Sequence, residues 1–120
     1  MVHFKNTIAF VVVLIVFLLL TLRPSSDALS IPIPHFDKLA HIGFFSVMAF
    51  FLILSLDKET FIKGEGQLNR VVCVISLLLL GGGVEFLQAD IPGRSASFAD
   101  GVADFVGSIL GLALYKRIGN

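Results

Sequence analysis

Four apolar runs, separated by short polar segments, dominate the hydrophobic pattern of this chain. A helix that crosses a bilayer needs about 20 mostly apolar residues, and the Lys and Arg side chains that flank a run can snorkel to the interface and lengthen it. The predicted spans cover about residues 5–23, 39–56, 71–88 and 98–115. The pattern therefore predicts an all-α, polytopic membrane protein, a four-transmembrane-helix bundle that forms a single domain over residues 1–120.

The bulk composition of the chain is also that of a membrane protein. Of its 120 residues, 56% are hydrophobic and only 15% are charged, with a mean hydropathy of +0.92, whereas a soluble domain is about 25% charged. The formal net charge is zero and no run of Lys or Arg occurs, so the electrostatic footprint of nucleic-acid binding is missing. The single cysteine, Cys73, forms no intrachain disulfide and is expected to face lipid or a neighbouring helix.

The first apolar run has two interpretations. It holds 15 residues, 8–22, with Lys5 before it and the small-residue segment 26–28 after it, an arrangement that resembles a secretory signal peptide. The run can also be lengthened into a span by Phe4 and by its snorkelling ends. We expect an uncleaved anchor, because the rest of the chain is membrane-embedded as well.

Basic residues are distributed unevenly between the two ends of the predicted bundle. With four spans, both termini and the loop between the second and third spans lie on one side. That side carries six basic residues and the other carries three, namely Lys5, Lys58, Lys63, Arg70, Lys116 and Arg117 against Arg23, Lys38 and Arg94. By the positive-inside rule, both termini are predicted to be cytoplasmic.

Polar residues gather at the opposite, extracytoplasmic end of three spans. They are Asp37, Lys38 and His41 at the second span, Glu85 and Gln88 at the third, and Arg94, Ser97, Asp100 and Asp104 at the fourth. Asp37 and His41, Glu85 and Gln88, and Ser97, Asp100 and Asp104 are three or four residues apart, which places each set on one helix face. Ionisable groups inside a span are costly, so they usually pair with one another or mark a functional site. Their convergence from three helices predicts a shared pocket.

Small residues accompany the polar ones. Gly107 and Gly111 continue the polar face of the fourth span as a small-xxx-small pattern, which lets another helix approach closely. Gly81 lies one turn before Glu85 on the same side of the third span. We therefore expect the polar faces of these spans to be packing faces too.

Two structural interpretations compete with a functional pocket. Carboxylates at helix ends, such as Asp90, can simply lie in interfacial water. Alternatively, the bundle is locked by ion pairs between Asp37 and His41 and between Arg94 and Asp100. We favour the functional interpretation because the polar groups come from three helices rather than from one.

The order of these residues resembles the pattern of the VanZ-like family of small bacterial membrane proteins. The matching segments are DKLAHIGFFSVMAF from residue 37, EFLQ from residue 85 and PGRSASFADGVADFVGSILG from residue 92. The chain departs from the family pattern at Asp104, where Asn is common, and at Phe44, where an aromatic residue with a hydroxyl is common. The resemblance implies a cell-envelope protein of the bacterial cytoplasmic (inner) membrane, in a family whose founding member is associated with resistance to the glycopeptide antibiotic teicoplanin.

The predicted pocket suits an enzyme that acts on an envelope lipid or a lipid-linked glycan. Its candidate catalytic residues are Asp37, His41, Glu85 and Asp100, with His41 oriented by Asp37 as a general acid or base. Lys38 and Arg94 are suited to hold a phosphate or carboxylate group. The candidate substrate-binding residues are Lys38, Gln88, Arg94, Ser97 and Asp104.

Other functions for the same residues stay open. The pocket could bind a headgroup without catalysing any reaction on it, so whether the protein is an enzyme is undecided. A proton or ion pathway is disfavoured, because residues 49–54 and 71–78 in the cytoplasmic halves of the spans lack Asp, Glu, Lys, Arg and His. We expect no metal and no cofactor, since one His with several carboxylates matches no strong motif such as His-Glu-x-x-His. The expected partners are the lipid bilayer and an envelope lipid or lipid-linked glycan, with no nucleic acid.

Overall fold

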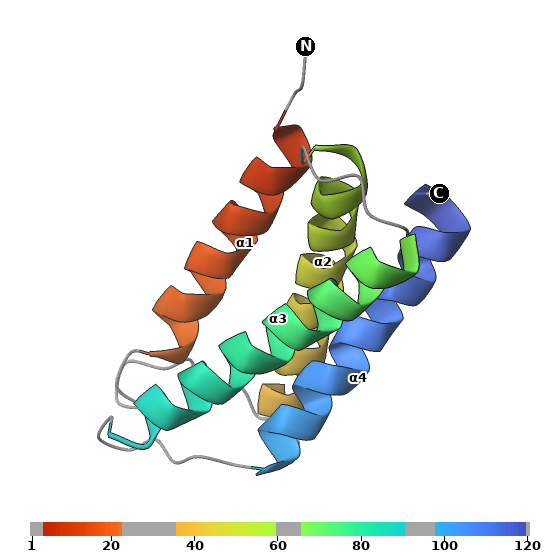
Figure 1. The fold of residues 1–120 in the computed structure, drawn as a ribbon. Coiled ribbons are helices and arrows are strands. Elements are labelled where there is room, and N and C mark those ends of the chain that lie inside the picture. Colours follow the sequence, from red (N-terminus) through yellow and green to blue (C-terminus); the bar gives the residue numbers. More distant parts are fainter. Residues whose placement is uncertain (1–3, 23–35, 60–65, 91–97, 120) are drawn as a thin grey trace.

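The described part of the chain forms an antiparallel helical bundle. A computed structural model describes residues 4–22, 36–59, 66–90 and 98–119. Its elements are α1 (Lys5–Thr21), α2 (Phe36–Lys58), α3 (Gly66–Gln88), α4 (Phe98–Leu114) and the short π-helix η2 (Tyr115–Gly119). Successive helices run up and down the bundle (Figure 1), and these residues contain no strand. The predicted all-α fold is confirmed for this part of the chain.

Among the described residues, three helical stretches are long and apolar enough to cross a membrane. They are Lys38–Lys58, Gln67–Gln88 and Phe98–Ile118, with 21, 22 and 21 residues, the last of which joins α4 and η2. The apolar helix α1 has only 17 residues, fewer than the roughly 20 that usually span a bilayer. The helices are therefore compatible with a membrane protein, and a fourth span through α1 stays a prediction.

The third helix begins earlier than the sequence pattern predicted. We expected a polar loop up to Arg70, but α3 starts at Gly66. The amide of Asn69 donates to Oδ1 of Asp57 at 2.6 Å, and the Tyr115 hydroxyl donates to Oδ2 of the same residue at 2.6 Å. Asp57 thus ties the first turn of α3 and the start of η2 to the end of α2.

Helices α2 and α4 pack closely because two glycines of α4 lie against the backbone of α2. A Cβ atom at Gly107 would lie 2.5 Å from the carbonyl oxygen of Ile42 and 3.0 Å from Cβ of Phe45. A Cβ atom at Gly111 would collide with the carbonyl oxygen of Ser46. The predicted small-xxx-small contact is confirmed, and its partner is the second helix.

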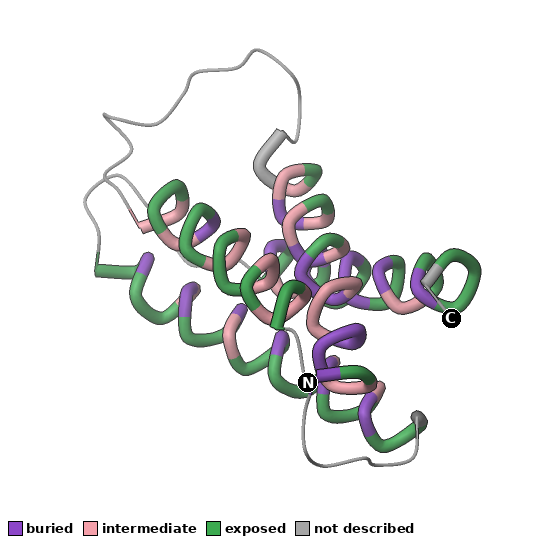
Figure 2. Tube along the Cα trace, turned by 90° about the horizontal axis from the view of Figure 1, so that it is seen from above, coloured by how far each residue is buried: buried purple, intermediate pink, exposed green. Residues whose placement is uncertain are grey.

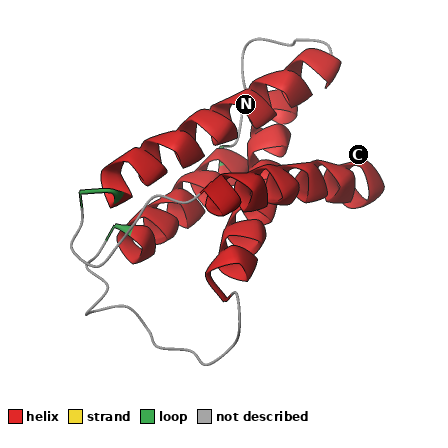
Figure 3. Ribbon diagram, turned by 90° about the horizontal axis from the view of Figure 1, so that it is seen from below, coloured by secondary structure: helices red, strands yellow, loops and turns green. Residues whose placement is uncertain are grey.

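Apolar side chains fill the space between the helices, and further apolar side chains cover the outside. Figure 2 shows buried positions on the inward faces and exposed positions on the outward faces, and Figure 3 shows the same helices from below. The largest fully buried apolar side chains are Phe17, Phe45, Met48, Ile53 and Leu77. Exposed ones include Ile8, Leu19, Leu79, Phe86 and Ile118. An outer surface this apolar suits contact with lipid.

The first turn of α1 is capped by a side chain from the end of α2. The N-cap residue Phe4 makes no side-chain hydrogen bond, and the Glu59 carboxylate accepts the backbone N–H groups of Asn6 and Thr7 at 2.9 Å each. The Thr7 hydroxyl also donates to Glu59 at 2.9 Å and lies 2.5 Å from the hydroxyl oxygen of Ser55. Burial raises the pKa of Glu59, but the hydrogen bonds from Thr7 and Asn6 outweigh it and leave the pKa below its ordinary value. A carboxylate here satisfies N–H groups that have no partner within the helix.

Candidate functional site

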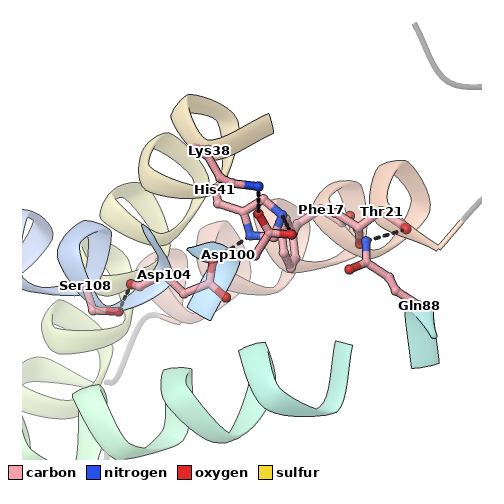
Figure 4. Close-up of polar contacts among 8 residues, drawn as sticks. All are labelled: Phe17, Thr21, Lys38, His41, Gln88, Asp100, Asp104 and Ser108. Atoms are coloured by element: carbon pink, nitrogen blue, oxygen red, sulfur yellow. Dashed lines mark hydrogen bonds and ion pairs between the residues drawn. The ribbon is translucent and has the colours of Figure 1, made fainter. Parts of the chain in front are cut away.

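One end of the bundle brings together ionisable side chains from three helices. Because neighbouring helices are antiparallel, the starts of α2 and α4 lie at the same end as the last turns of α3. We define the His41 cluster as Lys38 and His41 of α2, Glu85 of α3, and Asp100 and Asp104 of α4. Figure 4 shows the members from α2 and α4 in contact with one another. The predicted convergence of these residues is observed.

The imidazole of His41 is held by a buried carboxylate of α4. Its Nδ1 lies 2.6 Å from Oδ1 of Asp104, a residue that is only 1% exposed. Gly81 of α3 makes room for this carboxylate, because a Cβ there would lie 2.5 Å from Oδ2 of Asp104. With a carboxylate as its partner, Nδ1 carries the proton, so in the neutral imidazole the lone pair is on Nε2.

The second nitrogen of His41 faces a second carboxylate. Nε2 lies 4.0 Å from Oδ2 of Asp100, whose Oδ1 pairs with Nζ of Lys38 at 2.8 Å. One donor atom from each of His41, Glu85 and Asp100 can be chosen so that all three lie within 4.8 Å of one another. The side chain of Lys38 is 33% exposed and that of Asp100 is 11% exposed. The cluster is thus partly exposed at Lys38 and buried at His41, Asp100 and Asp104.

Aromatic side chains enclose the imidazole. The ring of Phe17, from α1, meets His41 edge-on with ring centroids 5.5 Å apart, and the ring of Phe45 stacks on it at 6.4 Å. Both phenylalanines are fully buried. Sequence reasoning did not single out Phe17, since it is one apolar residue within an apolar run and only the docking of α1 on α2 places it here.

Gln88 connects the same end of α3 to α1. Its Nε2 donates to the backbone oxygen of Thr21 at 2.9 Å, and the residue is only 4% exposed. Its Oε1 is buried and has no hydrogen-bond partner among the described residues. Figure 4 shows the amide of Gln88 directed to Thr21. Gln88 therefore offers a buried acceptor at the same end of the bundle as the cluster.

Three of the predicted site positions lie outside what the structure describes. They are Arg94, Ser97 and the side chain of Asp37, so the predicted Asp37–His41 and Arg94–Asp100 pairs lie outside it too. Among the described side chains, Asp104 contacts Nδ1 of His41 and Lys38 pairs with Asp100. Spacing carried a signal for the first contact. Since α2 and α4 start at the same end, His41 and Asp104 lie at similar depths.

The described members of the His41 cluster carry an excess of negative charge. They comprise three carboxylates, one ammonium group and one imidazole. Carboxylates held among apolar helices are stabilised by a proton or a cation beside them. Electrostatically, the cluster therefore favours a proton or a cation as a ligand.

Comparison with family models, with curated proteins and with solved structures finds no significant match to this chain. The VanZ-like resemblance thus rests on the residue pattern alone, and the site is interpreted from its own geometry.

Proposed function

We propose that this chain is a four-span protein of the bacterial cytoplasmic membrane that binds and acts on the polar headgroup of an envelope lipid or lipid-linked glycan. Both termini are cytoplasmic in this proposal, which places the His41 cluster at the extracytoplasmic face. The observation that carries the proposal is the setting of His41. One ring nitrogen is held by a buried carboxylate, and the other faces Asp100 and Glu85 at one end of apolar helices.

The position of the cluster supports a headgroup as the ligand. It lies at the end of helices whose outer faces are apolar, the level at which headgroups meet the hydrocarbon region. The partly exposed side chain of Lys38, paired with the buried Asp100, forms its accessible edge, while His41 and Asp104 are buried. A lipid beside the bundle can present its polar group to this edge without leaving the membrane.

The arrangement also supports a chemical role rather than a purely structural one. A hydrogen bond to Asp104 is sufficient to fix the imidazole in the bundle. The 4.0 Å separation between Nε2 and Asp100 is too long for a hydrogen bond, so Nε2 is not tied up in a hydrogen bond to that carboxylate. An oriented imidazole with an available lone pair is a common reactive group in enzymes.

The family resemblance supports the same assignment. The motif residues Lys38, His41, Glu85 and Asp100, which resemble the VanZ-like pattern, are the residues whose side chains meet in the cluster. The resemblance links the protein to the cell envelope and makes glycopeptide susceptibility a phenotype to measure. A proton or ion pathway is less well supported, because the middle of the bundle is filled by apolar side chains such as Met48, Ile53 and Leu77.

The test compares the purified wild-type protein with His41→Gln in nanodiscs made from bacterial lipid extract. Bound lipids and new lipid products are identified by mass spectrometry, and thermal unfolding is followed in parallel. We expect His41→Gln to fold and to retain bound lipid, because glutamine keeps hydrogen-bonding capacity. Product formation should fall by about 100-fold or more, the usual effect of removing such a group.

The matched control is Glu59→Gln, a change at the opposite end of the bundle that should leave turnover intact. Two results would contradict the proposal. One is a wild-type protein that neither enriches nor converts any lipid class. The other is a His41→Gln protein whose loss of function merely follows its loss of folded protein. Retained lipid binding without turnover in the wild-type protein would establish a binding module instead.

A further inference from the structure

We propose that the His41 cluster is a binding site for one divalent transition-metal ion of the Zn²⁺ type, with Nε2 of His41 and carboxylate oxygens of Glu85 and Asp100 as ligands. The inference deepens the proposed function, since it assigns a cation to the same site. All of the proposed ligands are protein atoms, so metal binding can be tested without any lipid.

The donor atoms are close enough to converge on one ion. One donor from each of His41, Glu85 and Asp100 lies within 4.8 Å of the others, and Nε2 is 4.0 Å from Oδ2 of Asp100. In a tetrahedral site with bonds of about 2.1 Å, neighbouring donors are about 3.4 Å apart. Convergence therefore requires shifts of about 1 Å, which rotation about side-chain bonds can supply.

The imidazole is already prepared as a metal ligand. Histidine ligands usually donate their other ring N–H to a carboxylate, which fixes the tautomer and the ring orientation. Asp104 occupies this position at 2.6 Å from Nδ1, and the aromatic rings of Phe17 and Phe45 hold the imidazole from its sides. The nitrogen that remains for a ligand bond is the one that faces Glu85 and Asp100.

An unmatched buried polar atom at the same end of the bundle is a further sign that a ligand binds here. Oε1 of Gln88, on a residue that is 4% exposed in the last turn of α3, has no hydrogen-bond partner among the described residues. Buried polar atoms are normally satisfied.

Charge favours the same conclusion. A divalent cation would be attracted by the three carboxylates of the cluster, Glu85, Asp100 and Asp104. Together with Lys38, it would also attract an anionic headgroup. One nitrogen with two carboxylate oxygens suits Zn²⁺ and leaves a coordination position for the headgroup. With His41 among its ligands, a bound ion would supply a Lewis acid beside the headgroup.

The experiment measures Zn²⁺ binding by the full chain in detergent, without lipid. The protein is stripped with EDTA, desalted and titrated with Zn²⁺ in competition with a chromophoric chelator. We expect one Zn²⁺ per chain and a rise in thermal unfolding temperature on binding. His41→Gln and Glu85→Gln should each weaken binding at least about 10-fold, and loss of the positioning carboxylate in Asp104→Asn about 10- to 100-fold.

Controls separate this site from adventitious binding. Glu59→Gln, a matched change at the other end of the bundle, should bind Zn²⁺ as the wild type does. When Co²⁺ replaces Zn²⁺, its absorption spectrum reports which atoms are the ligands. A spectrum typical of mixed nitrogen and oxygen ligands supports the site even if one of the variants folds poorly. The inference is overturned if the wild type binds no Zn²⁺, or if His41→Gln, Glu85→Gln and Asp104→Asn all bind it as the wild type does.

The lipid measurement is repeated in EDTA so that the two proposals fail separately. Lipid binding or turnover that persists without metal, together with absent Zn²⁺ binding, overturns the metal site and leaves the proposed function standing. If the protein binds Zn²⁺ specifically but neither enriches nor converts any lipid, the metal site stands and the proposed function is overturned.

Discussion

At the residue scale, buried carboxylates at the two ends of the bundle have different roles. Asp104 accepts a hydrogen bond from Nδ1 of His41, which leaves Nε2 as the ring nitrogen that can bind a ligand. Glu59, at the other end, accepts hydrogen bonds from the backbone N–H groups of Asn6 and Thr7 and so caps α1, because the side chain of Phe4 cannot. Both contacts join residues far apart in the sequence, so they stabilise the arrangement of helices rather than a single helix.

The Glu59 cap should make stability depend on pH in acid. Its pKa in the folded protein lies below the ordinary value of 4.5, so the ionised carboxylate stabilises the fold above pH 4.5. This stabilisation is lost as the pH falls through the folded-state pKa. Thermal unfolding in detergent from pH 7 to pH 3 should show a fall for the wild type that Glu59→Gln lacks. Equal falls in both proteins would contradict a role for this carboxylate.

At the element scale, α2 and α4 form the close helix contact that the glycines of the fourth predicted span indicated. The glycines of α4 remove the side chains that would keep the helices apart, and the carboxylates on the same face of α4 are thereby brought to His41. Gly81 of α3 plays a similar part, since it admits the carboxylate of Asp104. Packing and site formation depend on the same faces.

Gly107→Ala should therefore destabilise the bundle. Its methyl group would lie 2.5 Å from the carbonyl oxygen of Ile42, a backbone atom that cannot turn aside, and overpacking of this kind costs about 1–3 kcal/mol. Gly43→Ala is the matched control in α2, because a Cβ there meets nothing within 4 Å. Unfolding temperatures measured side by side in detergent check the pair. A Gly107→Ala protein as stable as Gly43→Ala would mean that α2 and α4 are not held this closely.

At the scale of the whole molecule, the antiparallel order of the helices determines which polar groups share an end. Lys38, Glu85 and Asp100 meet because α2 and α4 start where α3 ends, while Asp57 and Tyr115 meet at the opposite end. The apolar side chains between the two ends suit the interior of a bilayer. Function and membrane topology are therefore linked, since the topology determines which compartment the His41 cluster faces.

We predict that the His41 end of the bundle faces outward. Single cysteines at Ser25, Gly64 and Ser95, placed in a Cys73→Ser background, can be probed in intact cells with a membrane-impermeant thiol reagent. Positions 25 and 95 should react from outside and position 64 should react only after the membrane is opened. The reverse pattern would place the cluster in the cytoplasm, and labelling of all three from outside would rule out four spans.

The sequence pattern was sufficient for much of the fold. The periodic apolar runs predicted the helices, the small-xxx-small pattern predicted a close contact of α4, and the polar spacing predicted that His41, Glu85 and Asp100 meet. Helix boundaries were less accurate, because α3 begins at Gly66 through the tie of Asn69 to Asp57. Such a contact depends on the neighbouring helix and leaves no periodic signal.

The sequence by itself determined what lies within single helices: the apolar lengths, the polar faces and the positions of the glycines, since these follow from residue spacing along a regular helix. Only the tertiary structure decided which side chains become partners. It placed Asp104 at Nδ1 of His41, Phe17 over the imidazole and Glu59 at the start of α1. The rotation and docking of one helix on another select these contacts from many residues on the same faces, and that selection depends on the packing of the whole bundle.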